Sequence, residues 1–121
     1  MLHHVGVEVS DLARSARFYD AVLQRLGARR LFEAERAIAW GVNDPGFWIA
    51  QRDRGPRPGW GHVAFAASGR AAVDAAYEAA LAAGGRSDGP PGPRPRYGPR
   101  YYAAYVLDPD GLRVELVSGG R

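Results

Sequence analysis

Two histidines, His4 and His62, stand at equivalent places in two similar halves of the chain. When His4 is aligned with His62, a tyrosine recurs at the same spacing in each half, as Tyr19 and Tyr77, and the register needs no gap. An imidazole can bind a divalent metal or transfer a proton near neutral pH. The repeat therefore predicts that two such groups lie on opposite sides of one cavity, related by a pseudo-twofold axis.

The composition removes several other chemistries. The chain of 121 residues has no cysteine and no lysine, which excludes disulfides, thiolate metal sites and Schiff-base catalysis. Its net charge is only +3, and its one local basic cluster is Arg94, Arg96 and Arg100, so we expect no nucleic-acid partner. No apolar run reaches the roughly 18 residues of a membrane span, and the N-terminus lacks a signal-peptide pattern. We therefore expect a cytoplasmic protein of one domain without a membrane partner.

Each half begins with an alternating strand and continues into a helix. Valines occupy alternate positions of residues 4–9, so His4 and Glu8 share the opposite face, and the second half alternates in the same way. Apolar residues then recur at helical spacing over residues 12–26 and 73–81. The strands expected after the helices are Ala28–Glu33, Arg36–Val42 and Phe47–Gln51 in the first half, and Tyr101–Leu107 and Leu112–Val117 in the second.

Polar and glycine-rich segments predict where these elements end. The expected caps and turns are Ser10–Asp11 and Ser68 before the helices, Gly27 and Gly84–Gly85 after them, and Asn43–Gly46 and Asp108–Gly111 between strands. Residues 52–59 are expected to link the halves. Residues 88–99, rich in proline and glycine, predict a loop that is either a lid, which we favour, or a surface segment.

Three segments of the chain resemble the vicinal-oxygen-chelate superfamily, which includes glyoxalases, bleomycin-resistance proteins and extradiol dioxygenases. They are residues 4–19, Gly61–Phe65 and Asp108–Leu116, in the family's order and spacing. The resemblance implies an α+β fold in one domain. Two tandem βαβββ modules, residues 1–58 and 59–121, would form a curved, partly open barrel. It also implies a homodimer, which some relatives form by exchanging modules between chains.

The resemblance further implies a metal site, whose matching residues here are His4, His62 and Glu115. Glu115 alternates with apolar neighbours, so it points away from the core as the two histidines do. Two imidazoles and a carboxylate suit divalent iron, manganese, nickel, cobalt or zinc. Each residue also has an ordinary interpretation: His4 at a surface, His62 as a buried hydrogen-bonded histidine, and Glu115 in solvent. His3 is expected to face away from the site.

A fourth protein ligand is not expected. When Phe47–Gln51 is aligned with Leu112–Leu116, Ala50 falls on Glu115. Enzymes that resemble glyoxalase I carry a second glutamate at this place, so the alignment disfavours glyoxalase I itself. A three-ligand site resembles those of extradiol dioxygenases and of fosfomycin-resistance thiol transferases.

Further residues are candidates for the same site. Tyr105 precedes Glu115 at the spacing at which both of those families place a tyrosine beside the metal, and Glu8 shares a face with His4. We expect Tyr105 and Glu8 to be catalytic acid–base groups, with an ordinary hairpin aromatic as the alternative for Tyr105. The residues expected to contact substrate are Trp48, Arg94, Tyr97 and Arg100. Solvation is the alternative for the two arginines.

Taken with the resemblance, these residues predict a divalent-metal-dependent enzyme, a dioxygenase or a lyase or transferase. Its small substrate would bind the metal through two neighbouring oxygens, and the metal would act as a Lewis acid. One alternative is a metal-free binding protein of the bleomycin-resistance type, although those proteins lack the three ligands. A fosfomycin-type thiol transferase ranks third, because that family uses a lysine and this chain has none.

Overall fold

The computed structural model describes residues 2–53 and 62–119, and it contains the two expected modules. The first consists of β1 (Val5–Val9), α1 (Leu12–Gln24), β2 (Arg29–Glu33), β3 (Ala37–Gly41) and β4 (Pro45–Gln51). The second consists of β5 (His62–Ala66), α2 (Arg70–Ala82), β6 (Arg86–Pro93), the 3-10 helix η1 (Pro95–Tyr97), β7 (Tyr102–Leu107) and β8 (Arg113–Ser118). The predicted α+β fold of two βαβββ modules is confirmed. The predicted boundary between residues 58 and 59 lies outside the described residues.

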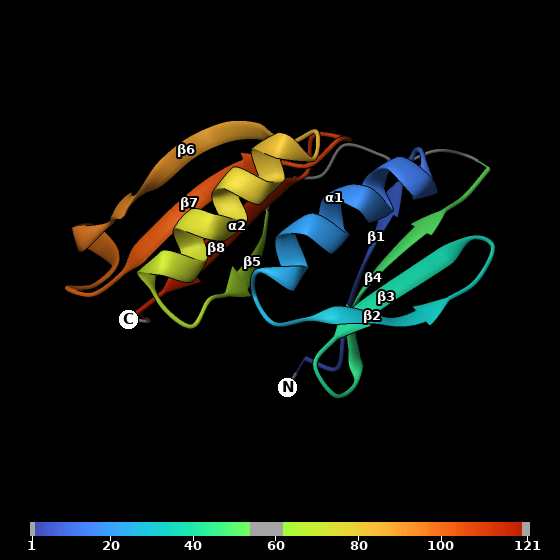
Figure 1. Cartoon of the computed structure of the whole chain (residues 1–121), viewed down its shortest axis with the longest axis horizontal. Helices are drawn as coiled ribbons and strands as arrows, with labels where there is room; N and C mark the ends of the chain where they lie inside the picture. Colours follow the sequence, from blue (N-terminus) through green and yellow to red (C-terminus); the bar gives the residue numbers. More distant parts are fainter. Residues whose placement is uncertain (1, 54–61, 120–121) are drawn as a thin grey trace.

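Each module forms its own four-stranded sheet, with strand orders β1-β4-β3-β2 and β5-β8-β7-β6 (Figure 1). The first strand of each module runs parallel to the last one, and the other neighbours are antiparallel. Within the described ranges no strand of one sheet pairs with a strand of the other. The predicted partly open barrel is therefore two separate sheets that do not close within one chain.

One hydrophobic core spans both modules. Figure 1 shows α1 and α2 side by side, each against the sheet of its own module. The alternating pattern of the strands decides which face meets the helices: Phe47 of β4 and Phe65 of β5 are on that face, with ring centroids 5.0 Å apart. The opposite face of each sheet, called the helix-free face below, carries the alternate residues, among them Trp48 in the first module and Glu115 in the second.

Side-chain hydrogen bonds also join the modules. The Tyr19 hydroxyl of α1 donates to Asp108 Oδ2 at 2.7 Å, and both residues are buried. Asp110, in the same β7–β8 turn, accepts from Arg14 Nη2 at 3.2 Å and from the Ser10 hydroxyl. These bonds add to the shared core, so the relative position of the two modules is set within each chain.

The helix ends follow the sequence with one exception. Asp11 caps α1, because its carboxylate accepts from the Arg14 amide, and Gly27 and Gly84 adopt the expected left-handed backbone, with φ of 86° and 98°. The prediction of Ser68 as an N-cap is wrong. Helix α2 begins at Arg70, so its N-cap position falls on Gly69, which has no side chain to offer. None of the helices in the described part of the chain is long and apolar enough to cross a membrane.

Two of the predicted loops are wrong in extent. Residues 86–93 form strand β6, although residues 88–99 were expected to be a loop, and the expected lid is reduced to the short connection around η1. Three prolines are tolerated in β6 because it is an edge strand and its pairing with β7 shifts register twice. The expected turn over residues 43–46 is also shorter, since β4 already begins at Pro45.

Candidate metal and substrate site

Two of the three predicted metal ligands lie side by side on the helix-free face of the second sheet. His62 Nε2 is 3.0 Å from Glu115 Oε1. Strand β5 runs parallel to β8 with Ala64 opposite Glu115, so His62 reaches the carboxylate diagonally. The Glu115 side chain is only 4% exposed, whereas the His62 side chain is 41% exposed. The alternative interpretations, a solvated Glu115 and a buried His62, are therefore wrong.

The separation of this pair fits two ligands of one divalent ion. Donors that each lie about 2.1 Å from an ion, at a right angle to one another, are about 3.0 Å apart. One imidazole nitrogen and one carboxylate oxygen are also suitable donors for zinc, manganese, iron, cobalt and nickel. The described ranges contain no group of three or more histidine, aspartate or glutamate side chains placed to share one ion. His4 is thus outside the pair within a single chain.

His4 lies instead at the edge of the first sheet. Its ring centroid is 6.3 Å from that of Trp48, and its Nδ1 atom is 2.9 Å from His3 Nδ1. His3 was expected to face away from the predicted metal site, and its ring lies next to that of His4. Both residues precede β1, which begins at Val5, so the two-residue alternation of a strand does not separate their side chains.

The strand register identifies the residue of the first module that corresponds to Glu115. Gly6 pairs with Trp48 in the first sheet, and Ala64 pairs with Glu115 in the second. With β1 aligned to β5 through their histidines, Gly6 corresponds to Ala64, so Trp48 corresponds to Glu115. The predicted correspondence of Ala50 with Glu115 is wrong by two residues. The first module still has no second carboxylate, because an indole stands at that place.

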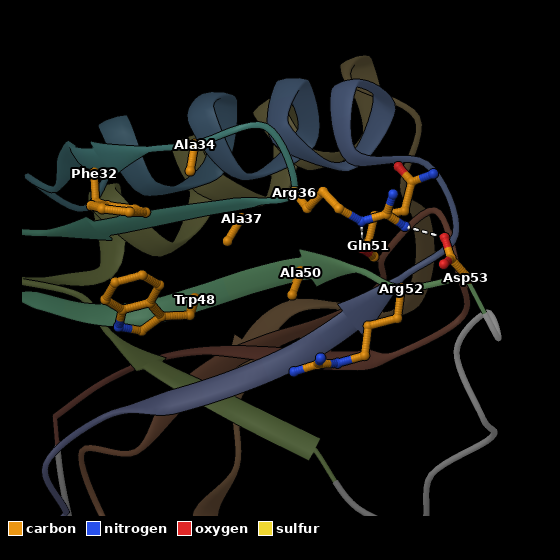
Figure 2. Close-up of a pocket in the computed structure, with 9 residues that line it drawn as sticks. All are labelled: Phe32, Ala34, Arg36, Ala37, Trp48, Ala50, Gln51, Arg52 and Asp53. Carbon is orange, nitrogen blue, oxygen red and sulfur yellow. Dashed lines mark hydrogen bonds and ion pairs between the residues drawn. The ribbon is translucent and has the colours of Figure 1, made fainter.

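Trp48 also lines a pocket of about 520 Å³ on the first sheet. Figure 2 shows Trp48 and Phe32 at one end of the pocket and Arg36, Arg52 and Asp53 at the other, with alanines between them. The Phe32 and Trp48 ring centroids are 5.1 Å apart. The methyl groups and two aromatic rings form an apolar surface on which a planar group of a ligand could lie.

The charged end of this pocket consists of ion pairs. Arg36 Nη2 is 2.6 Å from Asp53 Oδ1, and Arg52 Nε is 3.0 Å from Glu8 Oε1. Glu8 lies opposite Ala50 in the β1–β4 register, so its position beside the pocket agrees with the expected face. The Glu8 side chain is 25% exposed, and the positive charge of Arg52 lies beside its carboxylate.

Two tyrosines of the second module surround Glu115. Tyr105 is directly opposite Glu115 in the β7–β8 register, but the hydrogen bond to Glu115 Oε2 comes from the Tyr101 hydroxyl at 2.5 Å. Tyr101 was not among the predicted site residues. The signal was present, because Tyr101 and Tyr105 occupy alternate positions and so share a face.

Two guanidinium groups lie close to the Tyr105 ring. The Arg113 Cζ atom is 4.0 Å from its ring centroid and the Arg94 Cζ atom is 5.7 Å away. Burial, and then the negative charge of Glu115, raise the pKa of Tyr105, while the positive charge of Arg113 opposes this shift. The phenol therefore stays protonated at neutral pH. Arg113, which was not among the predicted site residues either, directly neighbours His62 in the strand register.

The residues expected to bind substrate from the proline-rich segment have other contacts. Arg94 donates to the Pro90 carbonyl at 2.8 Å and to the Pro93 carbonyl at 3.3 Å. Tyr97 is 42% exposed, and its ring centroid is 5.4 Å from that of Tyr101. Arg100 is exposed. Arg94 and Tyr97 thus lie beside the tyrosines around Glu115.

Known proteins are similar to this chain in sequence and in fold. The profile of the Glyoxalase/Bleomycin resistance protein/Dioxygenase superfamily matches residues 1–116. The protein YqjT of Bacillus subtilis strain 168, itself uncharacterized, is 31% identical over 130 residues, which cover 97% of this chain and 98% of that protein. A glyoxalase/bleomycin resistance protein from Albidiferax ferrireducens T118 is 33% identical with a TM-score of 0.83, covering 96% of this chain and 97% of that chain. The fosfomycin resistance protein FosX from Mesorhizobium loti is 27% identical with a TM-score of 0.72, covering 98% of this chain and 92% of that chain.

Proposed function

The chain belongs to the Glyoxalase/Bleomycin resistance protein/Dioxygenase superfamily, and we propose from this premise that it is a divalent-metal-dependent enzyme. Its substrate would be a small molecule that binds the metal through two neighbouring oxygens. The observation that carries the proposal is the pair of His62 and Glu115, with donor atoms 3.0 Å apart. A divalent ion bound there would supply Lewis-acid stabilisation of negative charge on the substrate oxygens. The reaction class would be that of a dioxygenase or of a lyase or transferase.

We propose that His4 of a second copy completes the site in a homodimer. The shared core and the Tyr19–Asp108 hydrogen bond fix the two modules of one chain in an arrangement that leaves His4 outside the His62–Glu115 group. A twofold axis that sets the first module of one copy against the second module of its partner would create two equivalent three-ligand sites. Each site would then have one half from each copy.

The remaining side chains would have distinct roles. The protonated Tyr105 would donate a hydrogen bond or a proton to a substrate oxygen near Glu115, and Glu8 would accept a proton on the opposite half of the site. Trp48, with Phe32, would contact the apolar part of the substrate.

A second candidate function is metal-free binding of a planar ligand. The observation that favours it is the Trp48–Phe32 pocket, which does not require a metal to hold an aromatic ring. A fosfomycin-type activity is a third candidate, supported by the match to FosX and disfavoured by the absence of lysine.

Metal binding by mixed dimers tests both parts of the proposal. One dimer combines a His4→Ala chain with a His62→Ala chain, isolated through two different affinity tags. A shared site predicts that this dimer keeps one intact site, since His4 of the second chain meets His62 of the first. The control dimer combines wild type with a His4→Ala/His62→Ala chain, and a shared site predicts no intact site there.

The metal content of both dimers is measured after incubation with Fe(II), Mn(II), Ni(II), Co(II) or Zn(II) and removal of unbound ions. About one ion in the first dimer and none in the control would support a shared site. The reverse result would place all three ligands in one chain. Negligible metal in the wild-type homodimer would overturn the enzyme proposal and leave the metal-free binding protein, which a ligand screen by thermal shift would then address.

A further inference from the structure

We propose that Tyr101 is a positioning residue of the metal site, an inference that rests on the proposed function. Its hydroxyl donates to Glu115 Oε2 at 2.5 Å, while Glu115 Oε1 lies 3.0 Å from His62 Nε2. The two oxygens of one carboxylate therefore have separate partners. Tyr101 holds one oxygen, and the other is directed toward the imidazole and toward an ion that both residues would share.

The Tyr101 side chain is itself firmly held. It is 8% exposed and packs in a small cluster with Ala103, Tyr105 and Val117. The ring of Tyr97 covers it, with ring centroids 5.4 Å apart. The phenol is thus fixed in place without any metal, so the orientation of the carboxylate is prepared before an ion arrives.

The backbone of Tyr101 is anchored as well. Its carbonyl accepts from the Arg94 amide at 2.8 Å, and its amide donates to the Gly98 carbonyl at 3.3 Å. These two bonds close the short connection around η1 onto the start of β7. The connection that was expected to act as a lid therefore holds Tyr101, which in turn positions the predicted metal ligand Glu115.

This support matters because Glu115 is almost fully buried. A buried carboxylate needs hydrogen-bond donors. A carboxylate that is free to rotate would present either one of its oxygens, or both, to the ion. Groups that hydrogen-bond to a metal ligand typically change metal affinity by about 10- to 100-fold when they are removed. The structure assigns that role to Tyr101, although Tyr105 is the tyrosine directly opposite Glu115.

The test compares Tyr101→Phe with Tyr102→Phe. Tyr102 is the matched control, because its hydroxyl also donates to a carboxylate, that of Asp74 at 2.7 Å, but on the other face of β7. The dissociation constant for Co(II) and the visible absorption spectrum of bound Co(II) are measured for the dimeric proteins. Tyr101→Phe is expected to weaken Co(II) binding by about 10- to 100-fold and to alter the spectrum. Tyr102→Phe is expected to leave both unchanged.

A second comparison separates positioning from general stability. In a Glu115→Ala background, Tyr101→Phe is expected to cause no further loss of Co(II) affinity, because Tyr101 acts through Glu115. Equal Co(II) affinities and spectra for Tyr101→Phe and Tyr102→Phe would overturn the inference. The proposed function would still stand, because the wild type would still bind the metal. A wild type that binds no Co(II) or other divalent ion would overturn both.

Discussion

Removal of the Tyr19 hydroxyl should weaken the junction between the two modules. Tyr19 is 0% exposed and Asp108 is 3% exposed, and the hydrogen bond between them is 2.7 Å long. Hydrogen bonds to charged groups contribute about 1.5–3 kcal/mol, and Tyr19→Phe leaves the buried carboxylate without this donor. For a chain of 121 residues, an unfolding entropy of about 2.1 cal/mol/K per residue converts this loss into a melting temperature lower by about 6–12 °C.

The size of this effect should depend on pH. Burial raises the pKa of Asp108, against the lowering effect of hydrogen bonds from Tyr19 and from two backbone amides. Because the folded pKa is raised, the stability from this group is fully present below its unfolded pKa near 4 and is lost as pH rises through the folded value. Tyr19→Phe removes a donor that favours the charged form, so the deficit should be largest at neutral pH and smaller near pH 4.

Urea unfolding measures the loss in the free energy of unfolding, and thermal unfolding measures the shift in melting temperature. Both are done at one fixed protein concentration, since the stability of a dimer depends on concentration. Tyr102→Phe is the control, because it removes a surface hydrogen bond of the same type to Asp74. Tyr19→Phe stability within about 0.5 kcal/mol of wild type at neutral pH, the range of ordinary surface changes, would refute the reasoning. A deficit of equal size at both pH values would refute the part that concerns ionised Asp108.

Two further predictions test the strand register and the backbone. Trp48→Glu should tighten Co(II) binding by on the order of tenfold, about 1.4 kcal/mol, because the register puts residue 48 where the second module has its ligand carboxylate. Ala50→Glu should not tighten Co(II) binding. Equal Co(II) affinities of Trp48→Glu and Ala50→Glu in a titration would contradict the register argument. Gly119→Ala should lower the free energy of unfolding by more than about 1 kcal/mol, because φ is +83° and a Cβ there would lie 1.8 Å from the Arg100 carbonyl oxygen. Gly46→Ala, with nothing within 4 Å of its Cβ, should change stability little in the same urea unfolding experiment.

The sequence pattern predicted both helices and every strand except β6, whereas the grouping of His62 with Glu115 came from the resemblance to the superfamily. Alternation in the strands and helical spacing in α1 and α2 reflect one face of each element packing in a common core. The same alternation put both side chains on the helix-free face, and neighbouring parallel strands then brought them together. The faces of the strands and helices thus follow from periodicity, whereas the choice of His62 and Glu115 as ligands follows from the resemblance.

Periodicity could not decide positions that differ by two residues. Ala50 and Trp48 lie on the same face of β4, so a slip of two between the aligned modules leaves every face assignment correct. Only the hydrogen-bonded register distinguishes them. Tyr105 of β7 and Tyr101, which directly precedes β7, present the same difficulty, since the reach of each phenol decides which one bonds to Glu115.

Other errors arose where local sequence preferences compete with tertiary packing. Proline and glycine dominate residues 88–93, which predicts a loop, yet the segment pairs with β7 at the edge of the sheet. An edge strand has one side without ladder bonds, so missing amide donors on that side cost little. The position of His4 relative to His62 depends on how whole modules pack, and the repeat alone could not reveal it.

The two modules have diverged in a way that bears on the substrate. At corresponding positions of the helix-free faces, the second module pairs a histidine with Glu115, whereas the first pairs a histidine with Trp48. One face is therefore suited to bind an ion and the other to contact an apolar ring. If dimerisation sets these two faces against each other, every site combines both properties.

We therefore expect a substrate whose oxygens lie at one end, toward Glu115, and whose flat apolar part lies at the other, against Trp48 and Phe32. Two modules that each carried a carboxylate at this position would not distinguish the two ends of a substrate. Replacement of Trp48 should therefore alter which substrates bind.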